Sequence, residues 1–271
     1  SSLRAGGLSV DQPFHVASVG KLFTATIIYQ LAEEGKLKLD DPIVKTIAKD
    51  KLGRLFVYEG INESDKVTYR HLLSHTSGIA DYFGGEVIKG EPMSKRLKTE
   101  RDKIWQPLEL LAFSEQNQRA VGVPGEKYLY SDTGYVLLGL LIESIEGKSF
   151  EKVLQERFFE PLEMNQSYMS MRSEPLSGVT IPIADLWLNG EEFGDQKALS
   201  VDWAGGGVIS TTGDLMKFSI ALHGGALISE QSLSNLFSNV NRFEQGIFTG
   251  DGGMTRSEER RVGKQCRYRW W

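Results

Sequence analysis

The sequence predicts an α/β protein of the α+β type in which helices predominate, and three segments carry that prediction. Residues 18–34 place apolar side chains at helical spacing and end at Gly35, a residue type that commonly closes helices. Residues 133–145 repeat this pattern more strongly and also end at a glycine. Residues 205–210 form a strand of small residues that turns into a helix over residues 212–222.

Shorter elements are expected between these segments. Residues 68–74 and 149–159 each indicate a further helix, and residues 186–190 resemble part of a hairpin. Residues 80–104 are polar and irregular. The sequence has no internal repeat, Pro- or Ser-rich linker or low-complexity tract, so we expect one large domain or two closely packed ones.

Composition and charge exclude several functional classes. The chain has 271 residues, 40% hydrophobic and 25% charged, which is typical of a soluble globular protein. The most apolar run, residues 135–142, is too short to span a bilayer. Six of the 31 Lys and Arg and two of the 36 Asp and Glu fall in residues 256–271, leaving 25 basic against 34 acidic residues elsewhere. A body this acidic does not attract nucleic acid electrostatically.

The basic residues 256–271 resemble the translation of a sequencing adapter, so we interpret them as a non-native tail. They contain Cys266, the only cysteine. The remaining chain therefore carries no disulfide, no thiolate nucleophile and no cysteine metal site. A basic arm that binds nucleic acid or membrane is the alternative interpretation of this tail.

Ser18 and Lys21 carry the main chemical hypothesis. Residues three apart on a helix share a face, so a hydroxyl and an amine can meet there. The amine can accept the serine proton if its pKa falls from about 10.4 toward 7 to 8, through desolvation or neighbouring positive charge. Spacing alone is weak evidence, because Ser149 and Lys152 repeat it, and either serine could simply cap a helix.

Four segments in order distinguish Ser18 from Ser149. They are residues 15–23 (HVASVGKLF), 72–79 (LLSHTSGI), 124–139 (PGEKYLYSDTGYVLLG) and 205–215 (GGGVISTTGDL). Together they resemble the β-lactamase and penicillin-binding-protein superfamily of serine hydrolases, which includes class C β-lactamases, D-alanyl-D-alanine carboxypeptidases and S-x-x-K esterases. The resemblance covers roughly residues 14–240 and implies Ser18 as nucleophile and Lys21 as its proton acceptor.

The resemblance also implies a fold of two parts, an antiparallel sheet flanked by helices and a mostly helical lobe, with the site between them. We therefore expect a partial domain over residues 1–255, with its helical lobe at about residues 42–200, followed by the tail. The family's Lys-Thr-Gly or His-Thr-Gly strand would lie just beyond residue 254, so we interpret the chain as a fragment with an incomplete sheet. That strand would supply one oxyanion-hole amide, the other being that of Ser18.

Tyr130 and Asp132 are the other two site residues that the resemblance implies. The family motif is Tyr-x-Asn, and this chain has Tyr130-Ser131-Asp132. Tyr130 would relay a proton between nucleophile and leaving group, as an acid or, if nearby ammonium groups stabilise its phenolate, as a base. Asp132 is either a substrate contact or the N-cap of the following helix. Ionised, it can only accept hydrogen bonds, unlike asparagine, which puts recognition of acylamino groups in doubt.

Other site classes fit less well. The segment around Ser18 lacks the first glycine of G-x-S-x-G, and Ser131-Asp132-Thr133 fits a Ser-Asp-Asn motif poorly. His71 and His75 have metal-binding spacing, but no glutamate completes H-E-x-x-H. No metal or organic cofactor is required by the expected chemistry.

Three questions stay open. The substrate is an ester, a β-lactam or a D-amino-acid peptide, and the alternative to an enzyme is a sensor that is acylated but not turned over. Residues 1–15 show no secretory signal, although the sequence begins without Met. The resemblance nevertheless suggests a periplasmic or secreted protein.

Overall fold

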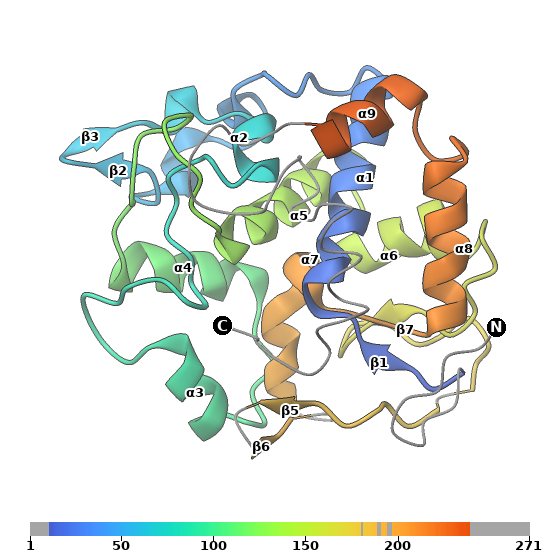
Figure 1. Ribbon diagram of the computed structural model, residues 1–271. Helices are drawn as coiled ribbons and strands as arrows, with labels where there is room; N and C mark the ends of the chain where they lie inside the picture. The colour runs from blue at the N-terminus through green and yellow to red at the C-terminus, as the bar shows by residue number, and fades with distance from the viewer. Residues whose placement is uncertain (1–10, 180, 189–190, 194–196, 239–271) are drawn as a thin grey trace.

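The structure is a computed structural model that describes residues 11–179, 181–188, 191–193 and 197–238 (Figure 1). The α-helices are α1 Lys21–Glu33, α2 Tyr69–Leu73, α3 Met93–Thr99, α4 Pro107–Asn117, α5 Asp132–Glu146, α6 Phe150–Leu154, α7 Trp203–Gly206, α8 Thr212–His223 and α9 Glu230–Ser238. The strands are β1 Phe14–His15, β2 Val57–Tyr58, β3 Ile61–Asn62, β4 Tyr168–Met169, β5 Trp187–Leu188, β6 Glu191–Glu192 and β7 Val208–Ser210. Five short 3-10 helices connect these elements, and a π-helical turn, Gln155–Phe159, extends α6.

A small antiparallel sheet joins segments that are far apart in the sequence. Strand β7 lies between β1 and β4, with Ile209 opposite both His15 and Tyr168. After β1, the backbone continues into the 3-10 helix Ala17–Gly20 and then into α1. In Figure 1, α1 runs between α8 on one side and α5 on the other. The sheet and α1 thus fix where Ser18 and Lys21 lie.

Helix α1 is buried on nearly every side, which explains its continuous apolar sequence. Phe23 packs against the rings of Phe158 and Phe218, with ring centroids 5.9 and 4.1 Å away. Thr24, a buried polar residue of α1, donates a hydrogen bond to the carbonyl of Ala204, 2.7 Å away. The hydroxyl is thereby satisfied inside the core and joins α1 to α7.

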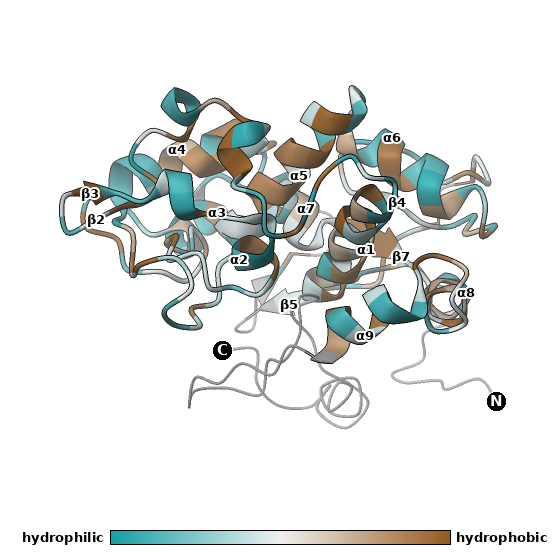
Figure 2. Cartoon of the chain, turned by 90° about the horizontal axis from the view of Figure 1, so that it is seen from above, coloured by the Kyte–Doolittle hydropathy of each residue, from teal (hydrophilic) through white to brown (hydrophobic). Residues whose placement is uncertain are grey.

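Helix α5 confirms the prediction for residues 133–145. Ser131 is its N-cap, accepting a hydrogen bond from the Gly134 amide at 3.4 Å. It ends at Gly147, whose φ of 65° is the left-handed conformation that glycine adopts at low cost. Figure 2 shows apolar residues along α5 where it passes through the middle of the molecule. Asp132 lies in the first turn of this helix, so the packing of α5 in the core fixes its position.

Two sequence expectations need correction, and one helix was missed. The segment 80–104 is not irregular throughout, because it contains α3, whose Met93 and Leu97 are buried. The expected strand over residues 205–210 is shorter, since Gly205 and Gly206 belong to α7 and only Val208–Ser210 pairs in the sheet. Helix α4 was not predicted, although Pro107 at its first turn is a common start signal.

Two further expectations concern membrane spans and the tail. Within the described residues, no helix combines the length and apolar character needed to cross a bilayer. The tail at residues 256–271, Cys266 and the position expected for the third motif lie outside the described residues.

Candidate active site

Ser18 lies in the 3-10 helix that precedes α1, and Lys21 is the first residue of α1. The preceding residue, Ala17, has a φ of 48°, a conformation that costs energy for any residue with a Cβ. Ser18 caps neither helix, because Val16 occupies the N-cap of the first and Gly20 that of the second. The simple capping interpretation of Ser18 is therefore wrong, and its hydroxyl serves other partners.

The four residues expected in the site come together. Oγ of Ser18 lies 2.9 Å from the Tyr130 hydroxyl and accepts a hydrogen bond from Nζ of Lys21 at 3.2 Å. The Tyr130 hydroxyl donates to Oδ1 of Asp132 at 3.1 Å. Asp132 also forms an ion pair with Lys21. The hydrogen bonds therefore run from Lys21 to Ser18, from Ser18 to Tyr130 and from Tyr130 to Asp132.

The Lys21 side chain is 1% exposed and is surrounded by acceptors. Its Nζ donates to the Gly205 carbonyl at 2.8 Å, in addition to its contacts with Ser18 and Asp132. These three partners match the three donors of an ammonium group. The desolvation expected from the sequence is present, whereas the charged group in direct contact is a carboxylate and not a second cation.

Tyr130 is held in a buried position that keeps it protonated. Burial, with the charge of Asp132 as the next cause, raises the pKa of the Tyr130 phenol well above its ordinary value. This raised pKa disfavours a resting phenolate at Tyr130. Its ring stacks on His75, with centroids 4.4 Å apart.

Asp132 is not the N-cap of α5, because Ser131 takes that position. Its side chain is 14% exposed and is directed to Lys21 and Tyr130. Its backbone amide donates to Oδ1 of Asp81 at 3.0 Å. Burial and the nearby Asp132 charge raise the pKa of Asp81 to about 6. Two carboxyl groups therefore lie on this side of the site.

Close contacts between glycines set the distance between the Ser18 segment and α7. A Cβ on Gly206 would lie 2.7 Å from the backbone carbon of Ala17, and a Cβ on Gly20 would lie 2.9 Å from Cα of Gly206. A Cβ on Gly205 would be 3.3 Å from Oδ1 of Asp132. Any larger residue in this run would displace the backbone next to Ser18 or crowd the ion pair.

His75 is a positioning residue that the sequence pattern did not reveal. Its backbone carbonyl accepts from the Leu129 amide at 2.8 Å, and its Nδ1 accepts from the Ser131 amide at 3.1 Å. These bonds hold the residues on both sides of Tyr130. Burial, followed by the charge of Lys21, lowers the pKa of His75 to about 3, so the ring is neutral near pH 7. The turn motif at residues 72–79 was the available signal.

A pair of residues near the site, His15 and Asp202, was also not predicted from the sequence. Nε2 of His15 lies 3.7 Å from Oδ2 of Asp202. Burial lowers the pKa of His15 to about 4 and, together with the charge of Asp132, raises that of Asp202 to about 7. Two isolated residues 187 positions apart give no local sequence pattern.

Ser149 and the histidine pair have structural roles. Ser149 is the N-cap of α6, and Lys152 extends into solvent, as expected of an unrelated S-x-x-K match. His71 completes a capping box with Thr68 at the start of α2, whereas His75 holds the Tyr130 segment. Across the described ranges, no three His, Cys, Asp or Glu side chains are grouped as a metal site would require.

A serine hydroxyl within hydrogen-bond distance of both a buried lysine amine and a phenol is typical of proteins that form acyl-enzymes through an S-x-x-K serine. The chain belongs to the beta-lactamase family, whose model matches residues 2–258.

Known proteins of this family support the assignment. The chain is 30% identical to penicillin-binding protein 4* of Bacillus subtilis over 246 residues, covering 86% of this chain and 50% of that protein. It is also 30% identical to penicillin-binding protein 4 of Amycolatopsis lactamdurans, over 64% of this chain and 40% of that one. The chain thus spans about half the length of the curated relatives it matches.

Solved structures show the same β-lactamase/transpeptidase-like fold. A D-stereospecific amidohydrolase from Streptomyces superposes with a TM-score of 0.76 at 28% identity, covering 92% of this chain and 72% of that one. D-amino acid amidase from Ochrobactrum anthropi gives a TM-score of 0.67 at 26% identity, over 86% of this chain and 63% of that one. The expected fold class is thereby confirmed.

Proposed function

We propose that this protein is a serine hydrolase that works through an acyl-enzyme formed on Ser18. The observation that carries the proposal is the position of the Ser18 hydroxyl, 3.2 Å from the Lys21 amine and 2.9 Å from the Tyr130 phenol. In the first step Oγ of Ser18 bonds to the substrate carbonyl carbon, and the bond to the leaving group then breaks. Water later attacks the same carbon and restores the serine hydroxyl.

The hydrogen bonds suggest how protons move during these steps. Tyr130 is protonated at neutral pH, so its phenol can donate to the leaving group while its oxygen receives the proton of Ser18. Lys21 can accept a proton only when Nζ has a lone pair, so an ammonium there must first release one. Asp132 is the carboxylate in contact with it and is suited to receive that proton. Lys21 and Tyr130 are thus the proposed proton-transfer groups.

The charges around Ser18 favour acyl donors without a carboxylate. Asp132 contacts Lys21, and Asp81 and Asp202 interact electrostatically with Asp132. Lys21 balances the charge of Asp132, so the unbalanced negative charge comes from Asp81, whose pKa is about 6, and above about pH 7 also from Asp202. This charge would repel a negative substrate group but not a neutral ester or a free ammonium. We therefore propose esters and amino-acid amides, rather than β-lactams or peptides with a terminal carboxylate, as substrates. The relatives named as an amidohydrolase and an amidase are consistent with this choice.

Intact-protein mass spectrometry tests the function directly. The wild-type protein, incubated with a chromogenic ester of a hydrophobic amino acid, should gain the mass of one acyl group and lose it as product accumulates. Ser18→Ala should show neither mass gain nor labelling by a serine-directed phosphonate, and Ser149→Ala should behave as wild type.

Two outcomes would contradict parts of this proposal. Labelling that persists in Ser18→Ala and disappears in Ser149→Ala would mean that the wrong serine has been assigned. An adduct that forms on Ser18 and then persists without turnover would instead identify an acylated sensor.

A further inference from the structure

His15 and Asp202 form a buried pair beside the Ser18 segment, and the proton transfers proposed above make no use of either residue. His15 lies on β1, two residues before Ala17 and three before Ser18. Asp202 is the last residue of the 3-10 helix Lys197–Asp202 and directly precedes α7. Nε2 of His15 is 3.7 Å from Oδ2 of Asp202, and the His15 side chain is 2% exposed. The pair therefore joins the nucleophile segment to the start of α7.

The other ring nitrogen of His15 bonds to the backbone of the nucleophile segment. Its Nδ1 accepts a hydrogen bond from the Ala17 amide at 3.3 Å. Burial lowers the pKa of His15 to about 4, so the ring is neutral near pH 7. A neutral imidazole has one nitrogen that accepts and one that carries the proton, so the proton lies on Nε2. A carboxylate facing Nε2 stabilises this tautomer, in which Nδ1 is available to Ala17.

The segment that His15 holds has a costly backbone conformation. Ala17 has a φ of 48°, and such a conformation persists only where its surroundings fix it. On one side, the Ala17 amide is held by the His15 ring. On the other, Gly206 of α7 approaches so closely that a Cβ on it would lie 2.7 Å from the Ala17 carbonyl carbon. Ser18 is the next residue, so these two contacts determine where its side chain begins.

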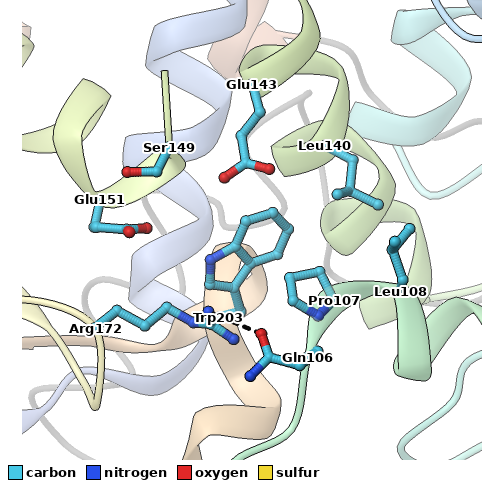
Figure 3. Close-up of a pocket in the computed structure, with 9 residues that line it drawn as sticks. All are labelled: Gln106, Pro107, Leu108, Leu140, Glu143, Ser149, Glu151, Arg172 and Trp203. Atoms are coloured by element: carbon cyan, nitrogen blue, oxygen red, sulfur yellow. Dashed lines mark hydrogen bonds between the residues drawn. The ribbon is translucent and has the colours of Figure 1, made fainter. Parts of the chain in front are cut away.

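Packing that does not involve His15 fixes the start of α7. Trp203, the residue after Asp202, also has a positive φ, of 25°. Its ring lies 5.3 Å from the ring of Phe150, and the Arg172 guanidinium is 5.9 Å from its centre (Figure 3). An anchored Trp203 leaves the adjacent Asp202 little freedom. The Asp202 carboxylate is therefore a fixed reference against which the His15 ring can be oriented.

Helix α7 also carries a hydrogen-bond acceptor for Lys21. The Gly205 carbonyl, three residues after Asp202, accepts from Nζ of Lys21 at 2.8 Å. Nζ in turn lies 3.2 Å from Oγ of Ser18. The pair thus connects the segment that places Ser18 with the helix that places the Lys21 amine. Small displacements of reacting groups lower reaction rates strongly, so this connection bears on the rate of acylation.

We propose that His15 and Asp202 are positioning residues for the nucleophile. Asp202 orients the His15 ring, and the ring holds Ala17 so that the Ser18 hydroxyl stays within reach of Lys21. This inference rests on the proposed acyl-enzyme function and deepens it. Both residues act through the backbone, so their loss should lower the rate of Ser18 acylation and leave the affinity for the acylating molecule unchanged.

Two substitutions of similar shape test the role of His15. His15→Asn keeps an oxygen close to the position of Nδ1, whereas His15→Leu has a similar branched shape without an acceptor. Inactivation by a serine-directed phosphonate at pH 8 separates the maximal labelling rate from the affinity for the reagent. His15→Leu should lower the maximal rate by at least about tenfold at unchanged affinity, and His15→Asn should recover most of it. Equal rates in the two variants would overturn the proposal, because the acceptor would then not matter.

A double-mutant cycle tests whether Asp202 acts through His15. Asp202→Leu should slow labelling by about threefold or more in the wild-type background and should add no further loss to His15→Leu. The same loss in both backgrounds would mean that Asp202 acts directly on the charge of Lys21, which contradicts the proposed role of the pair. Asp50→Leu makes the same exchange on the surface, in the 3-10 helix Lys49–Leu52, and should label as wild type.

Melting and NMR measurements separate positioning from a purely structural role. Lower melting temperatures alone would not place His15→Asn above His15→Leu in labelling rate. Heteronuclear NMR of the histidine ring nitrogens needs no activity and applies even if the leucine variants fail to fold. The signal that disappears in His15→Asn should show a neutral ring with its proton on Nε2, and a proton on Nδ1 would contradict the proposal. Wild-type protein that melts cooperatively but is never labelled would instead contradict the acyl-enzyme function, and the NMR result would then decide on the pair by itself.

Discussion

The phenolic oxygen of Tyr130 lies 2.9 Å from Oγ of Ser18, although 112 positions separate the two residues in the sequence. Strand β1 leads into the 3-10 helix that carries Ser18, and His75 holds the segment that carries Tyr130. Two parts of the fold that are far apart in the sequence therefore meet at this contact. A contact built in this way depends on the packing of the whole domain. Changes in either part are therefore expected to alter the reactivity of Ser18.

Removing the Tyr130 hydroxyl should impair catalysis without unfolding the protein. Tyr130→Phe keeps the ring that stacks on His75 but loses the proton donor, so kcat/KM for an ester should fall by about 100-fold or more. Steady-state kinetics and thermal melting measure the two effects. Tyr58→Phe, in the β2–β3 hairpin, is the matched control and should leave both unchanged. Wild-type kinetics in Tyr130→Phe would remove Tyr130 from the proton route.

Replacing Asp132 should change substrate preference. Asp132→Asn removes a negative charge next to Lys21 and introduces an amide donor, so repulsion of carboxylate-bearing substrates should decrease. The ratio of kcat/KM for a cephalosporin to that for a short-chain ester should rise by about tenfold or more. An unchanged or lower ratio would mean that Asp132 does not determine the substrate class.

Adding one methyl group to Gly206 should displace the Ser18 segment. A Cβ there would lie 2.7 Å from the Ala17 backbone, so Gly206→Ala should lower the free energy of unfolding by roughly 1 to 3 kcal/mol. It should also slow phosphonate labelling of Ser18. Gly213→Ala in α8 is the control, because its nearest neighbour would be 3.8 Å away. If Gly206→Ala and Gly213→Ala have the same free energy of unfolding and the same rate of Ser18 labelling, the contact between residue 206 and Ala17 does not determine the position of the Ser18 segment.

Asp202 should make stability depend on pH. Its folded-state pKa is raised to about 7, whereas an unfolded aspartate titrates near about 3.9. Between these values the folded protein holds a proton that the unfolded chain has lost, so the contribution of Asp202 to stability decreases as pH rises through this window. Asp202→Asn should therefore melt at a higher temperature than wild type at pH 8, with the difference shrinking toward pH 4.

The exposed Asp185 provides the comparison for that measurement, since Asp185→Asn should give no pH-dependent difference. A melting difference between Asp202→Asn and wild type that is the same at pH 4 and pH 8 would contradict the raised pKa.

Local sequence patterns predicted the parts of the fold that depend on neighbouring residues. The apolar spacing of α5, its closing Gly147 and the start of the Ser18 helix are visible in the sequence because helix formation is local. The spacing also predicted the contact between Ser18 and Lys21. The Gly205 carbonyl was not predicted as a partner of Lys21, since it reaches Lys21 only through packing of α7 on α1. For the same reason His75 and Asp202 were missed. Their roles come from burial and from contacts across the domain.

The neutrality of His75 has a consequence for specificity in different environments. Burial lowers the pKa values of His75 and His15 to about 3 and 4 and raises those of Asp81 and Asp202 to about 6 and 7. As pH rises through about 6 and 7, the two histidines are already neutral and the two carboxyl groups lose their protons, so the surroundings of Ser18 become more negative. An acidic medium would thus broaden the range of acceptable acyl donors, and a neutral one would narrow it.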